Sequence, residues 1–139
     1  MSVFGYGNGL MDTDTNENER RKKQAAFWIE YSQQLSTAIR YVEALAAAER
    51  AIQLDESSAE AWYVKGTCQA MLAQYEQALK AFEQALALND RFVPAWDGKA
   101  WVLGILGDKV GALAAIDRAL ELDPGYFEAV KRKKRLEVM

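Results

Sequence analysis

The chain has 139 residues, half of them hydrophobic, and a formal net charge of −3, which is typical of one folded domain and not of a disordered chain. It contains no histidine and a single cysteine, Cys68, so the commonest general base and transition-metal ligand is missing and no intramolecular disulfide can form. No run of 18 apolar residues occurs, which argues against a transmembrane helix.

Charge is unevenly distributed along the chain. Residues 24–130 are acidic overall, whereas the last nine residues, KRKKRLEVM, carry five basic side chains and one acid. An acidic body makes nucleic acid an unlikely partner for the folded part, and leaves the basic tail as the candidate for contact with nucleic acid or another acidic surface. At the N-terminus the charges follow the few apolar residues, the reverse of a secretory signal, so a cytoplasmic location is expected.

The N-terminal residues 1–14, MSVFGYGNGLMDTD, are rich in glycine and predict a flexible leader. Aspartate and threonine residues that can cap a helix come next, followed by charged helix formers. This order predicts that the first helix begins near Thr15, upstream of the repeated part of the chain.

Three segments then align without gaps at a period of 34 residues: 25–58, 59–92 and 93–126. A repeat of this length indicates one helical or mixed unit that is stacked several times. Tryptophan, alanine and leucine recur in the same columns: Trp28, Trp62 and Trp96; Ala44, Ala78 and Ala112; Ala51, Ala85 and Ala119; Leu54, Leu88 and Leu122.

Each unit has the apolar spacing of two amphipathic helices, which in the second unit are predicted over residues 59–72 and 75–88. Small residues suit close approach of the helices, and large ones such as Trp62 and Phe82 suit the spaces between them. The repeated tryptophans are therefore interpreted as core residues. Gly107 supplies the turn between the helices of the third unit, whereas the first unit has no glycine there.

After the third unit, residues 127–139 predict a capping helix, over about 127–137, with a basic tail. Phe127, Val130 and Leu136 share one side of it and the basic run occupies the other. Such a helix would cover the last apolar surface of a stack of repeats. The basic run is interpreted mainly as a solvated face.

These units resemble the tetratricopeptide repeat, a helix–turn–helix unit of the same length. The second unit has the family pattern at Trp62, Gly66, Ala78, Phe82 and Ala85. The third has it at Trp96, Ala100, Gly107, Ala112, Ala119 and Pro124, and the first, more weakly, at Trp28, Ser32, Tyr41, Ala44 and Ala51. The resemblance implies an all-α fold, a right-handed α-solenoid of three antiparallel helix–turn–helix units within residues 15–126, followed by the capping helix.

In this family the first helices line a concave groove that holds a peptide or helix of a partner protein. The resemblance therefore implies a non-enzymatic protein–protein interaction module, an adaptor or chaperone-like scaffold, without cofactor or metal. The family's groove-facing columns and the start of the capping helix hold Ile29, Glu30, Gln33, Thr37, Glu60, Tyr63, Val64, Thr67, Met71, Asp97, Trp101, Ile105, Lys131 and Arg132.

One subclass of the family clamps the terminal carboxylate of chaperone tails with lysine, asparagine and arginine. The corresponding columns of this chain hold Ile29, Gln33, Val64, Pro94 and Gly98. The clamp is therefore expected to be absent, and an apolar or helical segment is a better match for the groove than an HSP70 or HSP90 tail.

Three questions stay open from the sequence. Trp101 either anchors a partner's side chain or packs against a neighbouring helix. The chain could instead self-assemble as a structural scaffold, a homo-oligomer formed through its N-terminal segment or its repeat ends, or its basic tail could contact nucleic acid. No catalytic constellation is present without histidine, and Cys68 is interpreted as a buried structural thiol, so an enzyme is not expected.

Overall fold

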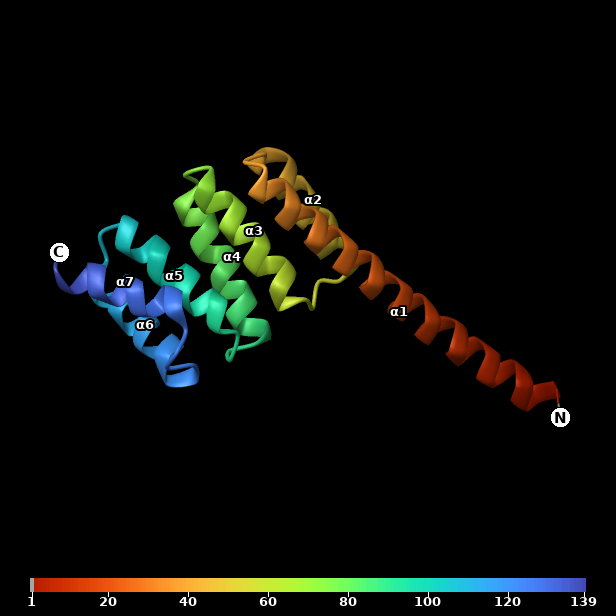
Figure 1. Cartoon of the computed structure of the whole chain (residues 1–139). Coiled ribbons are helices and arrows are strands. Elements are labelled where there is room, and N and C mark those ends of the chain that lie inside the picture. The colour runs from red at the N-terminus through yellow and green to blue at the C-terminus, as the bar shows by residue number, and fades with distance from the viewer. Residues whose placement is uncertain (1) are drawn as a thin grey trace.

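The computed structural model describes the backbone of residues 2–139 and the side chains of residues 15–139 (Figure 1). Helices are the regular elements throughout this part, which confirms the all-α prediction. They are α1 (Ser2–Thr37), α2 (Tyr41–Leu54), α3 (Ala59–Met71), α4 (Tyr75–Leu88), α5 (Val93–Ile105), α6 (Lys109–Leu122) and α7 (Phe127–Glu137).

The helices form three hairpins that stack in chain order. α1 pairs with α2, α3 with α4 and α5 with α6, and each hairpin contacts the next through α2 and α3 or through α4 and α5. α7 packs on α5 and α6 at the far end of the stack (Figure 1). Because each hairpin touches only its neighbours, the molecule is an α-solenoid closed at one end by a single helix.

The helices of the second unit and the capping helix were predicted to within one residue. α3 begins after Ser58, whose hydroxyl accepts a hydrogen bond from the amide of Ala61 at 3.1 Å. Such an N-cap satisfies one of the amides that a helix start leaves without a partner. At the start of α6, Asp108 does the same for Gly111 at 2.8 Å.

The turn inside each hairpin has the same backbone geometry in all three units. Gly107 has a φ of +88°, and the residues in the same column, Ile39 and Ala73, each have a φ of 61°. This left-handed conformation costs a residue with a side chain about 1–2 kcal/mol. The missing glycine of the first unit therefore leaves the turn unchanged, and Ile39 adopts the strained conformation.

α1 begins at Ser2 and not near Thr15 as the sequence predicts. Residues 15–24 of this helix are exposed, and among them Arg21 donates its guanidinium N–H groups to the carbonyls of Gln53 at 3.0 Å and Leu54 at 3.4 Å. A cation there pairs with the carbonyls left free at the end of α2. The flexibility predicted for residues 1–14 stays a prediction, because their side chains lie outside the described part.

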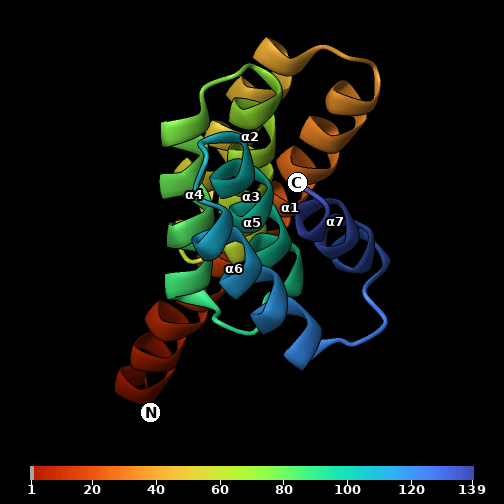
Figure 2. The ribbon, with the colours of Figure 1, turned by 90° about the vertical axis from the view of Figure 1, so that its left-hand side faces the viewer.

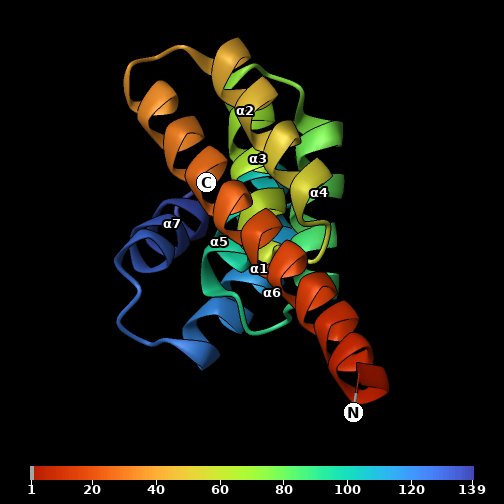
Figure 3. The ribbon, with the colours of Figure 1, turned by 90° about the vertical axis from the view of Figure 1, so that its right-hand side faces the viewer.

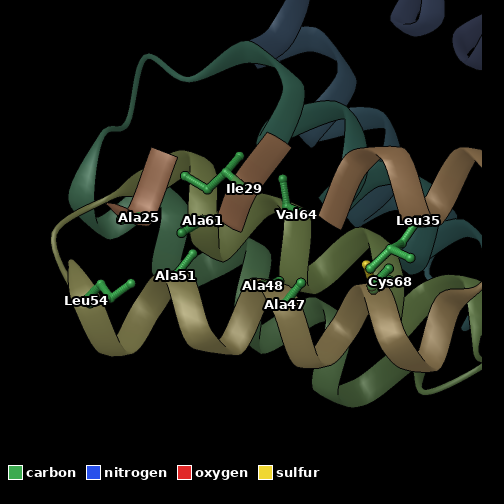
Figure 4. Packing of buried hydrophobic residues seen from close by; sticks show 11 residues of the cluster. Ala25, Ile29, Leu35, Ala47, Ala48, Ala51, Leu54, Ala61, Val64 and Cys68 are labelled. Carbon is green, nitrogen blue, oxygen red and sulfur yellow. The ribbon is translucent and has the colours of Figure 1, made fainter. Parts of the chain in front are cut away.

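Small side chains allow the first two hairpins to approach closely. Figure 4 shows Ala47, Ala48 and Ala51 of α2 beneath Ile29 of α1 and Val64 of α3. All five are buried. Alanine at these positions lets the helix axes come near each other, and the larger residues of α1 and α3 fill the space between them.

One aromatic ring joins the second and third hairpins. Phe82 of α4 is fully buried and lies directly over two glycines, Gly66 of α3 and Gly98 of α5. A Cβ atom at Gly66 would lie 2.8 Å from the Phe82 ring, and one at Gly98 would lie 2.7 Å from it. The ring therefore occupies the space that side chains at these two positions would need.

The repeated tryptophans are half-buried at the hairpin junctions. The indole N–H of Trp62 donates to the carbonyl of Glu56 at 3.1 Å, and that of Trp96 donates to the carbonyl of Asp90 at 2.8 Å. Each indole thus ties the start of its own helix to the loop before it. The sequence predicts core tryptophans; in the structure they are half-buried and pack against the buried clusters from outside.

The capping helix is held by two ion pairs as well as by apolar contacts. Ala129 and Leu136 are buried, whereas Phe127 is 64% exposed, so its predicted place on the buried side is wrong. Helix α7 turns instead so that Arg132 reaches Asp97 of α5 at 2.8 Å and Lys133 reaches Asp117 of α6 at 3.1 Å. Two charges of the basic run therefore fix this helix to the stack.

The Phe82 contact predicts opposite effects for two glycines of α5. Gly98→Ala should lower the free energy of unfolding by about 1–3 kcal/mol, because the added methyl group collides with a buried ring. Gly104→Ala should raise it by about 0.5–1 kcal/mol, since a Cβ there would be 3.4 Å from Leu136, an ordinary contact. Urea unfolding followed by circular dichroism measures both, and equal effects would contradict this packing.

Candidate functional site

One side of the stack is formed by α1, α3, α5 and α7. Neighbouring helices of this series contact each other, whereas among the described residues α2, α4 and α6 do not. The stack therefore curves toward the first helices and makes their exposed side concave. Figure 2 looks along the stack and shows α1 and α7 on one side and α4 on the other. This concave side of α1, α3, α5 and α7 is called the groove below.

A pocket of about 240 Å³ opens between α1 and α3 in the groove. No charged side chain lines it, and its polar groups are hydroxyls and one amide. Such a lining suits uncharged polar or small apolar groups of a ligand. The lining residues are Gln33, Ser36, Thr37, Tyr63, Val64, Thr67 and Cys68.

Tyr63 lies at the inner wall of this pocket. Its ring centroid is 5.9 Å from that of Phe82 and 5.6 Å from that of Phe92, distances at which aromatic pairs attract each other. Burial raises the pKa of the Tyr63 hydroxyl, so it stays protonated and can donate a hydrogen bond at neutral pH. Thr67, one turn further on, donates its hydroxyl to the Tyr63 carbonyl at 3.0 Å.

An ion pair lies in the middle of the groove floor. Nε of Arg132 is 2.8 Å from Oδ1 of Asp97, and a second guanidinium nitrogen is 3.2 Å from Oδ2. Asp97 is 6% exposed, so its charge is largely removed from water and needs this partner. The bidentate pair therefore holds α7 against α5. It also neutralises the charge of Arg132 within the chain.

A second pocket, of about 360 Å³, lies between α5 and α7. Trp101, Ile105 and Leu136 give it an apolar lining, and Arg132 and Arg135 are its charged side chains. The Arg132 guanidinium lies 5.8 Å from the centroid of the Trp101 ring, within range of a cation–π contact. Trp101 therefore packs against the capping helix and lines the pocket at the same time.

Tyr126, just before α7, belongs to the same region of the groove. Burial, together with the negative charge of Asp97 and Glu128, raises the pKa of Tyr126 to about 12. The Tyr126 hydroxyl interacts electrostatically with Tyr63, Asp97 and Arg132. The groove centre thus combines two protonated tyrosine hydroxyls with one internal ion pair.

Within the described residues, no group of histidine, cysteine, aspartate and glutamate side chains is arranged to hold a metal ion. No helix of the described part has the length and apolar character that crossing a membrane requires. The buried Cys68 thiol lies 3.8 Å from the Ser32 hydroxyl, and burial raises its pKa. A thiol with a raised pKa is a poor nucleophile.

Known proteins share this architecture. A family model described as Tetratricopeptide repeat matches residues 59–92. The second hairpin therefore matches one tetratricopeptide repeat. No curated protein matches the sequence as a whole.

Several solved tetratricopeptide repeat domains have the same fold. The Arabidopsis OM64 TPR domain is 19% identical, with a TM-score of 0.81 over 85% of this chain and 98% of that one. The second TPR domain of human RPAP3, in complex with the HSP70 peptide SGPTIEEVD, is 19% identical, with a TM-score of 0.76 over 86% and 98%.

The type III secretion chaperone SycD of Yersinia enterocolitica, in complex with a peptide of the translocator YopD, has 14% identity and a TM-score of 0.72 over 81% and 92% of the two chains. At identities this low the likeness concerns the fold, and it agrees with the predicted α-solenoid.

The residues predicted to face the groove differ in how much of each side chain is exposed. Ile29, Val64 and Asp97 are buried, so they support the groove from below and offer little surface of their own. Tyr63, Thr67, Trp101 and Arg132 are half-buried at its floor. The predicted residues with exposed side chains are Glu30, Gln33, Thr37, Glu60, Met71, Ile105 and Lys131.

The positions that form a carboxylate clamp in some tetratricopeptide repeat proteins are apolar or small here. Ile29 and Val64 belong to the buried cluster of α1–α3, and Gly98 lies under the Phe82 ring. Gln33 is the polar side chain of the set and lines the α1–α3 pocket. These residues place no cation where the clamp would need one.

Sequence reasoning missed three contributors to the groove: Ser36, Tyr126 and Arg135. Ser36 occupies a column that faces the groove in the repeat family, so the repeat alignment could have identified it. Tyr126 and Arg135 lie outside the repeated units, and their place depends on how α7 packs. The sequence carries no periodic signal for that packing.

The raised pKa of Tyr126 predicts a loss of stability in alkali. Its folded pKa of about 12 lies above the ordinary value of 10.0, so the stabilising effect is complete below about pH 10 and is lost as the pH rises toward 12. Tyr126→Phe should make the unfolding free energy fall less steeply in this window. Urea unfolding at several pH values measures the slope, and equal slopes for both proteins would contradict a buried Tyr126 hydroxyl.

Proposed function

We propose that this chain is a protein–protein interaction module whose groove binds a short peptide or helix of a partner protein. The observation that carries the proposal is the pair of pockets along the groove, one between α1 and α3 and one between α5 and α7. Two domains of the same fold, from human RPAP3 and from SycD, form complexes with peptides, which supports the same use of the groove here.

The two pockets differ in chemistry and therefore favour a ligand with two kinds of side chain. The α1–α3 pocket is uncharged and suits a small or polar residue. The α5–α7 pocket presents Trp101 and Ile105, with Arg135 exposed beside them, and suits a large apolar residue followed by a carboxylate. A segment with a large apolar residue next to an acidic one, in an adaptor or chaperone-like complex, is the ligand that fits best.

Selection from a library of random short peptides against the full chain tests the groove. Peptides that pair an apolar residue with aspartate or glutamate should be enriched. Ile105→Glu should weaken the binding of a selected, fluorescently labelled peptide by about tenfold or more, because it places a like charge at the exposed rim of the α5–α7 pocket. Fluorescence anisotropy measures the change.

Val110→Glu is the matched control, since Val110 is 81% exposed on α6, outside the groove, and Ile105 is 47% exposed. Its affinity for the peptide should equal that of the unchanged chain. Failure to enrich any peptide, or equal binding by both variants, would overturn the proposed use of the groove.

A further inference from the structure

The N-terminal end of the stack carries an exposed aromatic cluster. Phe27 is 60% exposed and Tyr31 40% exposed, and their rings are stacked with centroids 6.2 Å apart. Trp28 contacts both, at 5.5 Å and 5.9 Å. Figure 3 looks onto this end, with α1 in the foreground and α2 beside it. The surface of Phe27, Trp28 and Tyr31 on α1 and Ala46 on α2, with the buried Ala47 at the bottom of the hollow between them, is called the end face below.

The other two units show what the positions of Phe27 and Tyr31 normally do. The column of Phe27 holds Ala61 and Ala95, which are fully buried. The column of Tyr31 holds two lysines: the Lys65 ammonium lies 5.3 Å from the Trp62 ring centroid, and that of Lys99 lies 5.6 Å from the Trp96 ring centroid. In these units a lysine covers the tryptophan and an alanine lies in the interface.

The column of Phe27 faces the preceding hairpin, since Ala95 packs in one cluster with Ala85 and Leu86 of α4, and in the third unit the column of Tyr31 does so as well. Lys99 pairs with Glu83 of α4 at 3.7 Å, and the hollow beside Lys99 is lined by α4 as well as by α5 and α6. The first unit has no hairpin in front of it within the described residues. Phe27 is therefore exposed in a column that the inner units bury against a neighbouring helix.

This arrangement is the reverse of what a free end requires. The end of a repeat stack stays soluble when its outer side is polar, and the chain follows that rule at α7 with exposed lysine and arginine. At the end face, Tyr31 stands where the other two units have lysine, and the column of Ala46 holds Lys80 in the second unit and Ala114 in the third. A contiguous exposed apolar patch of this kind indicates an interface.

The charges beside the end face match a second copy of the same surface. Its hollow, of about 400 Å³, has Glu43 and Arg50 as its charged lining residues, and Ala46 and Ala47 lie midway between them on α2. A two-fold axis passing between the two alanines would place Glu43 of each copy opposite Arg50 of the other copy. In the free chain both charges make contacts within α2 or with its cap, Glu43 with Arg40 and Arg50 with Gln53.

We propose that two copies of this chain pair through their end faces in an isologous dimer. The alanines of α2 allow close approach, the rings of Phe27 and Tyr31 are removed from water against the second copy, and the charges of Glu43 and Arg50 fix the antiparallel direction. Spacing around α1 puts Gln33 and Thr37 on a different side of the helix from Tyr31, so the groove stays free. The inference does not depend on the ligand of the groove.

Sedimentation equilibrium of the full chain over a wide concentration range tests the dimer. The unchanged chain should have twice the monomer mass of 15.6 kDa. Tyr31→Lys, which introduces the residue of the other two units, should raise the dimer dissociation constant by about tenfold or more while circular dichroism shows an intact fold. Phe127→Lys is the matched control: Phe127 is 64% exposed on α7, and its replacement should leave the dimer unchanged.

A charge exchange tests the two-fold arrangement. Glu43→Arg alone and Arg50→Glu alone should each weaken the dimer, because each puts like charges opposite one another. Mixing these two variants should restore a dimer that contains one copy of each, since both pairs are then of opposite sign. A chain that stays monomeric would overturn the proposal. So would a dimer that Tyr31→Lys leaves intact, or a mixture that does not associate.

Discussion

The contact of the Phe82 ring with Gly66 and Gly98 is the constraint on which the geometry of the stack depends. One side chain of α4 touches the backbones of α3 and α5 at once, so it sets the distance between the second and third hairpins. That distance determines how closely the first helices approach and hence how the groove curves. Tyr63, at the groove floor, packs against the same ring, so the site and the core share one aromatic contact.

Repetition explains why so much of the fold could be predicted. A column that must be small or apolar in one hairpin must be so in the next, and three copies made the pattern of Ala44, Ala78 and Ala112 visible without any structure. The features that were missed occur once each. The helical start of α1 at Ser2 and the exposure of Phe127 have no counterpart in another unit from which they could be predicted.

The groove was predicted less completely than the fold, for a related reason. The column of a residue in the repeat predicts the direction in which its side chain leaves the helix. It does not predict which side chain of a neighbouring helix covers that residue. The column of Asp97 predicts that it faces the groove, whereas Arg132 of α7 covers it and holds it in an ion pair. Trp101 shows the same effect, because the two roles left open by the sequence are compatible: it packs beneath Arg132 and lines a pocket.

The departures from the repeat are the more informative part of the sequence. In the second and third hairpins, one column holds alanine (Ala61 and Ala95) and another holds lysine (Lys65 and Lys99). These residue types suit a hairpin that another hairpin precedes. The first hairpin has Phe27 and Tyr31 in those columns. If only solubility had acted on this end of the stack, a lysine would be expected at the position of Tyr31, as in the other two units. Covering the end face removes its aromatic rings from water, and a second copy of the chain does so with the residues it already carries.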